Sequence, residues 1–195
     1  MSGDVHVRIR ERLGGRFPGA TRLVICCRGT GVQAMEAMRV LMGRLKLTVN
    51  EDKTRRCRIP QEHFDFLGYA FGRCDSKQTG KAYIGTRPSK KSVHKVCRTI
   101  SEATRRQALG QSVAEQVVAL NRILVGWANY FCLGPVSPAY VVLDRHATRR
   151  LRWWLCLKHK QPGRGTSRYP DRYLHSRLGL ARLSVRTRYL SWAKA

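Results

Sequence analysis

The chain has 195 residues, 43% of them hydrophobic, and its 38 Lys and Arg outnumber 12 Asp and Glu for a formal net charge of +26. This length fits one compact domain or two small ones, and the apolar fraction excludes a wholly disordered chain. No run of about eighteen apolar residues occurs, which excludes a membrane-spanning helix. The charge predicts a polyanionic partner, with nucleic acid as the first choice and a membrane surface as the alternative.

The N-terminal part predicts a leader, a strand and a helix. Residues 1–19 contain four glycines and Pro18, and we expect a poorly ordered leader there. Residues 23–27 form a continuous apolar run that is typical of a buried strand. From Val32 onward, apolar residues recur at intervals of three and four, which predicts an amphipathic helix. These residues are Ala34, Met35, Met38, Leu41, Met42 and Leu45.

Three strands are expected next. Residues 56–59 predict a short strand, and the mostly apolar residues 64–71 predict a strand that is covered on both faces. Residues 78–81 have the composition of a hairpin turn, and they lead into a strand at 82–85. We therefore expect the first 85 residues to form the end of a small α/β unit.

Helical patterns dominate after Pro88. Ser89 is placed to cap a helix that begins at Lys90, and further helices are expected at 113–131 and from about 139 to 158. Prolines and glycines predict a basic loop at 161–169, followed by a short helical piece at 173–178. On the third helix, the spacing predicts that the inward residues are Tyr140, Leu143, Ala147, Leu151, Trp154 and Leu155.

The cysteines and histidines predict no metal site and no catalytic group. The seven cysteines are an odd number without a Cys-x-x-Cys pair, which favours reduced thiols in a cytoplasmic protein over a zinc site. No arrangement of Ser, Cys or Asp that is typical of nucleophilic catalysis accompanies the histidines His94, His146, His159 and His175. We expect them to be ordinary surface or core residues.

Several segments resemble the C-terminal part of the reverse transcriptases, or maturases, that group II introns encode. Residues 22–29 resemble the strand after the catalytic Tyr-Ala-Asp-Asp turn, and residues 45–55 and 63–69 resemble the lysine-bearing turn and primer-gripping strand of the palm. Residues 87–92 resemble the start of the thumb. The most specific match is Leu120–Phe131, with its Gly-Trp-x-x-Tyr-Phe, followed by Leu143–Arg145 and Leu151–Trp154. It is similar to the maturase-specific region, domain X.

The resemblance implies a lost metal site. In the family, the two aspartates of the turn hold catalytic Mg²⁺, which prefers anionic oxygen ligands. Here Ala20 matches the alanine of the turn, but Thr21 and Arg22 replace both aspartates. Because an arginine repels the ion, we expect no catalytic residue, no cofactor and no polymerase activity. Only nineteen residues precede the matching segment that begins at Ala20, so we also expect the fingers, the first palm carboxylate and the endonuclease of the family to be missing.

The expected fold class is α+β, with a small partial palm-like α/β unit followed by a mainly α-helical thumb and maturase bundle. The expected boundaries are a leader at 1–19, a palm remnant at 20–86, a thumb-like helix at 87–111 and a maturase-specific domain at 112–195. From residue 116 onward there are fifteen Lys and Arg but only two acids, Asp144 and Asp171. The strongest cationic excess therefore falls in the part that resembles the RNA-binding region of the family.

The family's thumb and domain X bind intron RNA and help it reach its splicing-competent fold, so the resemblance implies RNA contacts here. Arginine suits this role because its planar fork bridges phosphate oxygens and stacks on bases. Trp153 lies off the apolar stripe of its helix and is the candidate for base stacking, whereas Trp127, Tyr130, Phe131 and Trp154 have core spacing. The full set of predicted RNA contacts is Lys90, Lys91, Lys95, Arg98, Arg145, Arg149, Arg150, Arg152, Trp153, Lys158, Lys160, Arg164 and Arg168.

Some readings stay open at this point. Asn121 and Asn129, eight residues apart on one helix face, either bind RNA or make internal polar pairs. Besides intron RNA, the resemblance admits primer–template nucleic acid and a separately encoded upstream half as partners. The chain is then a splicing cofactor, a polymerase fragment that works only with that upstream half, or a remnant of a truncated mobile element without function.

Overall fold

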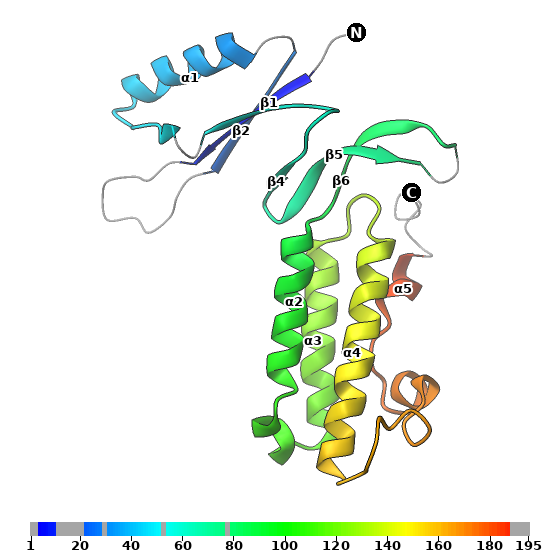
Figure 1. Cartoon of the computed structure of the whole chain (residues 1–195). Coiled ribbons are helices and arrows are strands. Elements are labelled where there is room, and N and C mark those ends of the chain that lie inside the picture. Colours follow the sequence, from blue (N-terminus) through cyan, green and yellow to red (C-terminus); the bar gives the residue numbers. More distant parts are fainter. Residues whose placement is uncertain (1–3, 11–21, 29–30, 52–53, 77–78, 188–195) are drawn as a thin grey trace. The chain divides into compact units, whose positions relative to one another are not determined.

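A computed structural model of the chain describes residues 4–10, 22–28, 31–51, 54–76 and 79–187. The chain divides into an N-terminal unit of residues 1–64, 71–75 and 81–85 and a helical unit of residues 65–70, 76–80 and 86–195. Strands dominate the first unit and helices the second (Figure 1). The α+β class expected from the sequence is confirmed. None of the helices in the described residues is long and apolar enough to cross a membrane.

The N-terminal sheet contains a strand that the sequence reasoning missed. Strand β1 (Asp4–Arg10) pairs antiparallel with β2 (Arg22–Arg28) and with β3 (Arg55–Arg58), so the strand order is β2-β1-β3. The expectation of a poorly ordered leader was therefore wrong for residues 4–10, while residues 11–19 lie outside the described part. The overlooked signal is the strict alternation of Val5, Val7 and Ile9 with polar residues, which is typical of a strand.

Helix α1 (Gly31–Arg44) contacts β1 and β2 and confirms the predicted amphipathic helix. Met35, Met38 and Met42 are buried on one face, and Ile25, Leu47 and Val49 pack against them. The other predicted apolar positions differ, since Leu41 and Leu45 are more than half exposed. Leu41 directly precedes Met42 and therefore lies about 100° around the helix from it, whereas Leu45 follows the end of the helix at Arg44.

A second sheet has the order β4-β5-β6, with β4 at Phe64–Phe66, β5 at Tyr69–Asp75 and β6 at Ala82–Pro88. The single strand predicted over 64–71 is thus two strands. Leu67 and Gly68 between them have φ values of 48° and 83°, and a two-residue loop with two positive φ angles is a tight hairpin turn. The glycine supplies the left-handed conformation that reverses the chain.

Three long helices form the second unit, as predicted: α2 (Lys90–Ala103), α3 (Val113–Tyr130) and α4 (Ser137–Lys158). The Ser89 side chain accepts a hydrogen bond from the Ser92 amide and caps α2, and Ser112 forms a capping box with Glu115 at the start of α3. A 3₁₀ helix, η2 (Arg106–Gly110), connects α2 to α3. Pro138 lies in the first turn of α4, where its missing N–H costs nothing.

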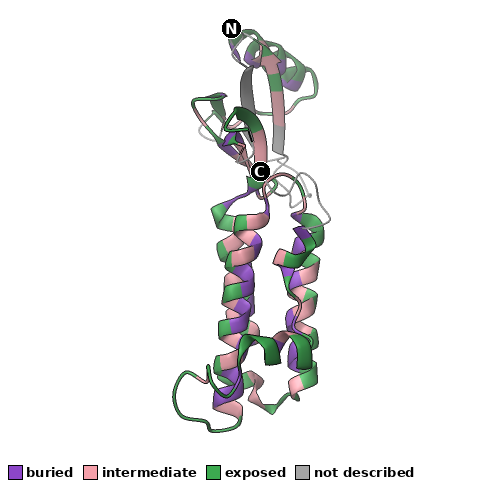
Figure 2. Cartoon of the chain, turned by 90° about the vertical axis from the view of Figure 1, so that its right-hand side faces the viewer, coloured by how far each residue is buried: buried purple, intermediate pink, exposed green. Residues whose placement is uncertain are grey.

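The buried core runs along the inward faces of α2, α3 and α4, where Figure 2 shows the buried positions as continuous stripes. All six residues predicted to face inward on α4 are buried, and Trp154 is fully inaccessible. A fully buried tryptophan packed among leucines is a large share of the hydrophobic stabilisation of a bundle of this size. The helical periodicity of the sequence therefore placed this core correctly.

The segment after α4 packs back on that helix through η3 (Tyr173–Arg177), a π-helical turn, and α5 (Leu183–Arg186). The buried Asp144 carboxylate of α4 accepts hydrogen bonds from the Leu183 and Ser184 amides at 2.8 and 2.9 Å. It thereby satisfies amide groups at the start of α5 that have no helical partner. In the preceding loop, Gly165 has a φ of +66°, and a Cβ there would overlap the Cys156 sulfur.

Candidate nucleic-acid interface

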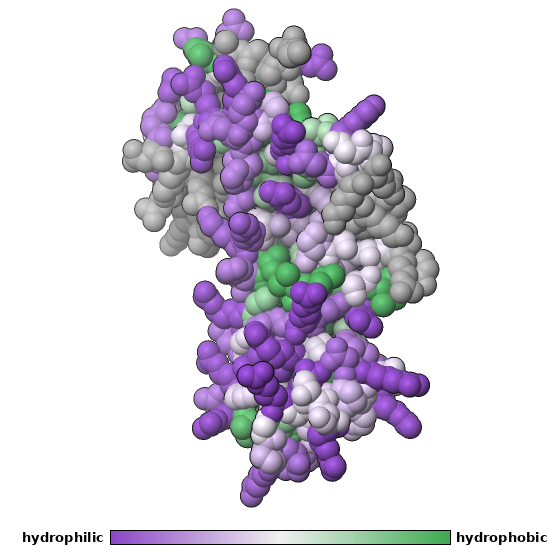
Figure 3. All heavy atoms as spheres, turned by 45° about the vertical axis from the view of Figure 1, so that its right-hand side comes forward, coloured by the Kyte–Doolittle hydropathy of each residue, from purple (hydrophilic) through white to green (hydrophobic). Residues whose placement is uncertain are grey.

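The helical unit carries a large excess of positive charge. Between residues 90 and 187 there are nineteen Lys and Arg and four acids. Each acid is engaged within the chain: Glu102 with Arg105, Glu115 with Ser112, Asp144 with the start of α5, and Asp171 with Arg152. Hydrophilic side chains cover most of the face of this unit that Figure 3 shows. Few carboxylates are therefore left to neutralise the remaining cations.

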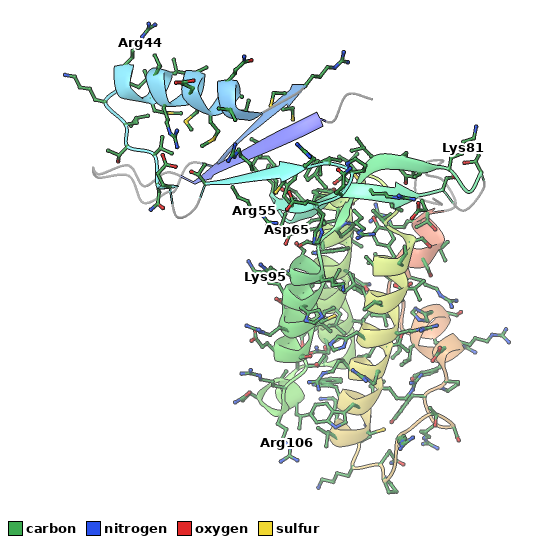
Figure 4. All side chains as sticks on the ribbon, turned by 45° about the horizontal axis from the view of Figure 1, so that its top comes forward. Arg44, Arg55, Asp65, Lys81, Lys95 and Arg106 are labelled. Atoms are coloured by element: carbon green, nitrogen blue, oxygen red, sulfur yellow. The ribbon has the colours of Figure 1, made fainter. Side chains whose placement is uncertain are left out.

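Nine of the predicted RNA contacts are exposed cations. Lys95 of α2 points away from the bundle in Figure 4. Their exposed side chains leave positive charge and hydrogen-bond donors accessible to a ligand. The nine are Lys90, Lys91, Lys95 and Arg98 on α2, Arg145 and Arg149 on α4, and Lys160, Arg164 and Arg168 in the following loop.

Contacts between α2 and α4 hold the exposed cations of these two helices on one rigid part of the bundle. His146 Nε2 of α4 lies 2.9 Å from the Cys97 carbonyl and 3.0 Å from Ser101 Oγ of α2. Arg149 follows one turn later, with its guanidinium 3.4 Å from His146 Nδ1. Burial lowers the pKa of His146, and the Arg149 and Arg150 charges lower it further, against the Cys97 carbonyl. The histidine therefore favours its neutral form at this junction.

Arg150 is partly buried and has a structural role. Its Nε donates to Thr104 Oγ1 at 2.8 Å, and its Nη2 donates to the carbonyls of Ser101 and Thr104 at 2.9 and 3.1 Å. Helix C-termini leave carbonyls without intrahelical donors, so this guanidinium closes the end of α2. Burial is the main cause that lowers the pKa of Arg150, and the charges of Arg149 and Arg105 act in the same direction.

Arg152 and Lys158 are also held by the fold. Arg152 donates to the Tyr169 carbonyl at 2.8 Å, forms an ion pair with Asp171, and its side chain is only 12% exposed. The Lys158 ammonium donates to two carbonyls of the α2–α3 connection at 2.7 and 2.8 Å. These two residues fasten the loops around α4. Their predicted contact with RNA stays a prediction, to which the structure adds an anchoring role.

The aromatic residues divide as the sequence indicates. Trp153 is 38% exposed, and the Arg150 guanidinium carbon lies 4.5 Å from its ring centroid. Phe131 is buried and stacks on Trp127 with ring centroids 4.5 Å apart. Tyr130 is the exception among the predicted core residues, since it is 54% exposed, although its hydroxyl donates to the Leu67 carbonyl at 3.1 Å.

Both candidate asparagines make internal polar pairs. Asn121 donates to the Gly179 carbonyl at 2.8 Å and accepts from the Ala181 amide at 2.7 Å. Asn129 accepts from Arg186 at 2.9 Å. Of the two readings left open by the sequence, internal pairing is the one seen here, because the C-terminal segment returns alongside α3.

Some exposed cations were missed by the sequence reasoning. Arg105 and Arg106 follow directly after α2, and Figure 4 shows Arg106 at that end of the bundle. Arg105 is close enough to Arg150 to lower its pKa. The adjacent arginines Arg105 and Arg106 could have indicated them, but the prediction considered only the cations on the face of the helix that precedes this pair. Four more exposed arginines occur between 172 and 186: Arg172, Arg177, Arg182 and Arg186.

If Thr21 and Arg22 occupy the family's metal positions, as the resemblance implies, these residue types do not suit magnesium. Thr21 lies outside the described residues, and Arg22 begins β2. A hydroxyl and a guanidinium provide no anionic oxygen, whereas Mg²⁺ binds through carboxylates and phosphates. Within the described residues, no group of three or more His, Cys, Asp or Glu is arranged to hold a metal ion.

Comparison with known proteins identifies the family of the helical part. The family model for the group II intron, maturase-specific domain matches residues 93–173. These residues span most of α2, all of α3 and α4 and the loop that follows, where seven of the nine exposed cations lie. No curated protein matches the chain. Residues 93–173 are therefore similar to the maturase-specific domain of the group II intron.

Proposed function

We propose that the chain is an RNA-binding maturase-type protein, related to group II intron reverse transcriptases, that binds intron RNA and assists its splicing. It has no polymerase activity of its own in this proposal, because Thr21 and Arg22 stand where the family's metal ligands would be. The observation that carries the proposal is the set of nine exposed cations of the helical unit, seven of them within the matched residues 93–173, where each acid is engaged within the chain.

The physical role of such a surface follows from RNA folding. A large RNA brings its phosphates together as it compacts, and cations fixed on a rigid helix offset their repulsion without the entropic cost of gathering free ions. The capped helices α2 and α3 and the Arg150 bridge to α4 supply that rigidity. Arginine adds bidentate hydrogen bonds to phosphate oxygens, so Arg98, Arg145 and Arg149 are expected to orient the RNA as well as attract it.

The test is salt-dependent binding to a group II intron transcript, with a shuffled transcript of equal length beside it. The test variant replaces three exposed cations of the helical unit with glutamine: Lys95, Arg98 and Arg149. The matched control replaces three exposed cations of the N-terminal unit: Arg44, Arg56 and Arg73. Both variants lose the same net charge, so a difference between them reports position and not total charge.

The proposal predicts a clear ranking. Each lost phosphate contact lowers the log–log salt slope by about 0.7–0.9, so the test variant is expected to lose about 2–3 from the slope while the control stays near wild type. Wild type is expected to prefer the intron over the shuffled transcript. Equal affinity for both transcripts, or equal losses in both variants, would show nonspecific attraction to a basic protein.

The compartment forms part of the same proposal. Seven cysteines, an odd number without a Cys-x-x-Cys pair, fit a reducing environment. We place the protein in the cytoplasm, where it would meet newly made transcripts.

A further inference from the structure

Trp153 is a large apolar residue that lies on the surface, outside the hydrophobic core of the helical unit. Its neighbour Trp154 is fully buried, whereas Trp153 leaves 38% of its surface exposed. An indole ring carries a large apolar face, and leaving it in water forgoes the stabilisation that burial gives its neighbour. A position of this kind on a cationic surface suits contact with a flat apolar partner.

Arg150 holds this ring in place. Its guanidinium carbon lies 4.5 Å from the ring centroid, within the range of a cation–π contact. The same guanidinium is fixed by its three hydrogen bonds to Ser101 and Thr104. Because the arginine is anchored to the end of α2, it restricts the indole as well. The ring is therefore ordered before any ligand arrives, which lowers the entropic cost of binding.

The surroundings suit the backbone of a nucleic acid strand. Arg149 is exposed beside Arg150 on α4, and Arg105 is close enough to act on Arg150 electrostatically. Glu102 is the acid nearest in sequence to this end of α2, and it pairs with Arg105 at 3.8 Å. Phosphates that flank a base on the indole thus meet positive charge, as in single-strand binding sites that combine stacking with a cationic groove.

We propose that Trp153, held by Arg150, is a stacking platform for one unpaired base of the bound RNA. The inference rests on the proposed function and specifies its RNA target. Bases inside a duplex stack on each other and offer no free face, so the platform selects a bulge, a loop or a single-stranded nucleotide. Within the described residues, this pair combines an exposed tryptophan with an arginine over its ring.

Three hairpin RNAs, each closed by a non-nucleotide linker in place of a loop, test the platform with the full chain. The first is fully paired, the second carries a one-nucleotide bulge, and the third carries the same bulge as an abasic nucleotide. The second and third have the same phosphates, so their affinity ratio isolates the base. Stacking on an aromatic side chain is worth about 1–3 kcal/mol per base, so wild type should favour the base-bearing bulge by about 5- to 150-fold.

Substitutions assign this preference to the ring. Trp153→Ala is expected to abolish it and Trp153→Phe to retain most of it, because phenylalanine keeps a flat face. The control Tyr83→Ala removes an aromatic residue that is 37% exposed in the N-terminal unit, and it should leave the preference unchanged. Since the wild-type comparison of base with abasic bulge needs no variant, a folding defect in Trp153→Ala does not remove the test.

The outcomes separate the two proposals. Salt-sensitive binding with equal affinity for the base-bearing and abasic bulges overturns the platform and leaves the proposed function standing. A preference that persists in Trp153→Ala overturns it too. Failure to bind any of the three hairpins or an intron transcript overturns both.

Discussion

Replacement of Arg150 with methionine is expected to destabilise the helical unit by about 2–4 kcal/mol. The substitution removes the donors to Thr104 Oγ1 and to the carbonyls of Ser101 and Thr104. A hydrogen bond from a charged donor contributes about 1.5–3 kcal/mol. The expected loss is smaller than the simple sum of the three bonds, because contributions from one side chain are not additive and ordering that side chain costs about 2 kcal/mol of rotamer entropy. Methionine keeps the chain length, so the packing of the aliphatic stem changes little.

Arg149→Met is the matched control, because it removes the same charge from the next position on the same helix. Arg149 is exposed, and its substitution is expected to change the free energy of unfolding by less than about 0.5 kcal/mol. Urea unfolding followed by far-UV circular dichroism and by tryptophan fluorescence measures both variants. All four tryptophans follow residue 126, so the fluorescence reports this unit. An Arg150→Met variant with the same free energy of unfolding as wild type would contradict this role of Arg150, and so would equal losses of stability in both variants.

Three other perturbations have definite expected outcomes. Gly165→Ala should destabilise the helical unit more than Gly163→Ala in thermal melts, since both have positive φ but only Gly165 lies against Cys156; equal effects would contradict this. Asp144→Ala should raise amide hydrogen exchange at the start of α5, and unchanged protection there would argue against the capping role. The pKa of His146 lies below its ordinary value in the folded state, so the unfolded chain takes up the proton first and stability falls as pH drops below about 6.5. His146→Gln should flatten unfolding free energies between pH 7.5 and 5.5, and an unchanged slope would assign the effect elsewhere.

The helical unit was predictable because its signals are local. Apolar residues at helical spacing define α2, α3 and α4, and Ser89 and Ser112 mark two of their starts. A bundle whose helices follow one another in the chain needs little long-range information to place its core. The fully buried Trp154 followed directly from its position in that stripe.

The N-terminal unit was harder to predict because its sheet depends on distant pairings. Residues 4–10 form the central strand by pairing with residues 22–28 and 55–58. The glycines and Pro18 that follow the strand are typical of an irregular segment, and they led to the prediction of a leader despite the alternating pattern of residues 5–9. The break at Leu67 and Gly68 was missed because the flanking residues are apolar on both sides of the turn, so hydrophobicity alone did not reveal it.

The candidate site was predictable in composition but not in the role of each residue. Arg149 and Arg150 are adjacent and carry the same charge, yet one is exposed and the other closes the end of α2. That difference depends on which residue of α4 lies next to the end of α2, and the sequence of α4 alone does not reveal this. Arg152 was predicted to contact RNA, and its contacts with Tyr169 and Asp171 likewise depend on a loop that the sequence of α4 does not contain.

The most direct measurement is the splicing rate of a precursor transcript that contains a group II intron, at a magnesium concentration where phosphate repulsion limits folding of the RNA. The account predicts that the wild-type chain raises this rate and that the variant lacking Lys95, Arg98 and Arg149 raises it far less. The control lacking Arg44, Arg56 and Arg73 should behave as wild type. A wild-type chain that binds the intron tightly and leaves its splicing rate unchanged would contradict the account.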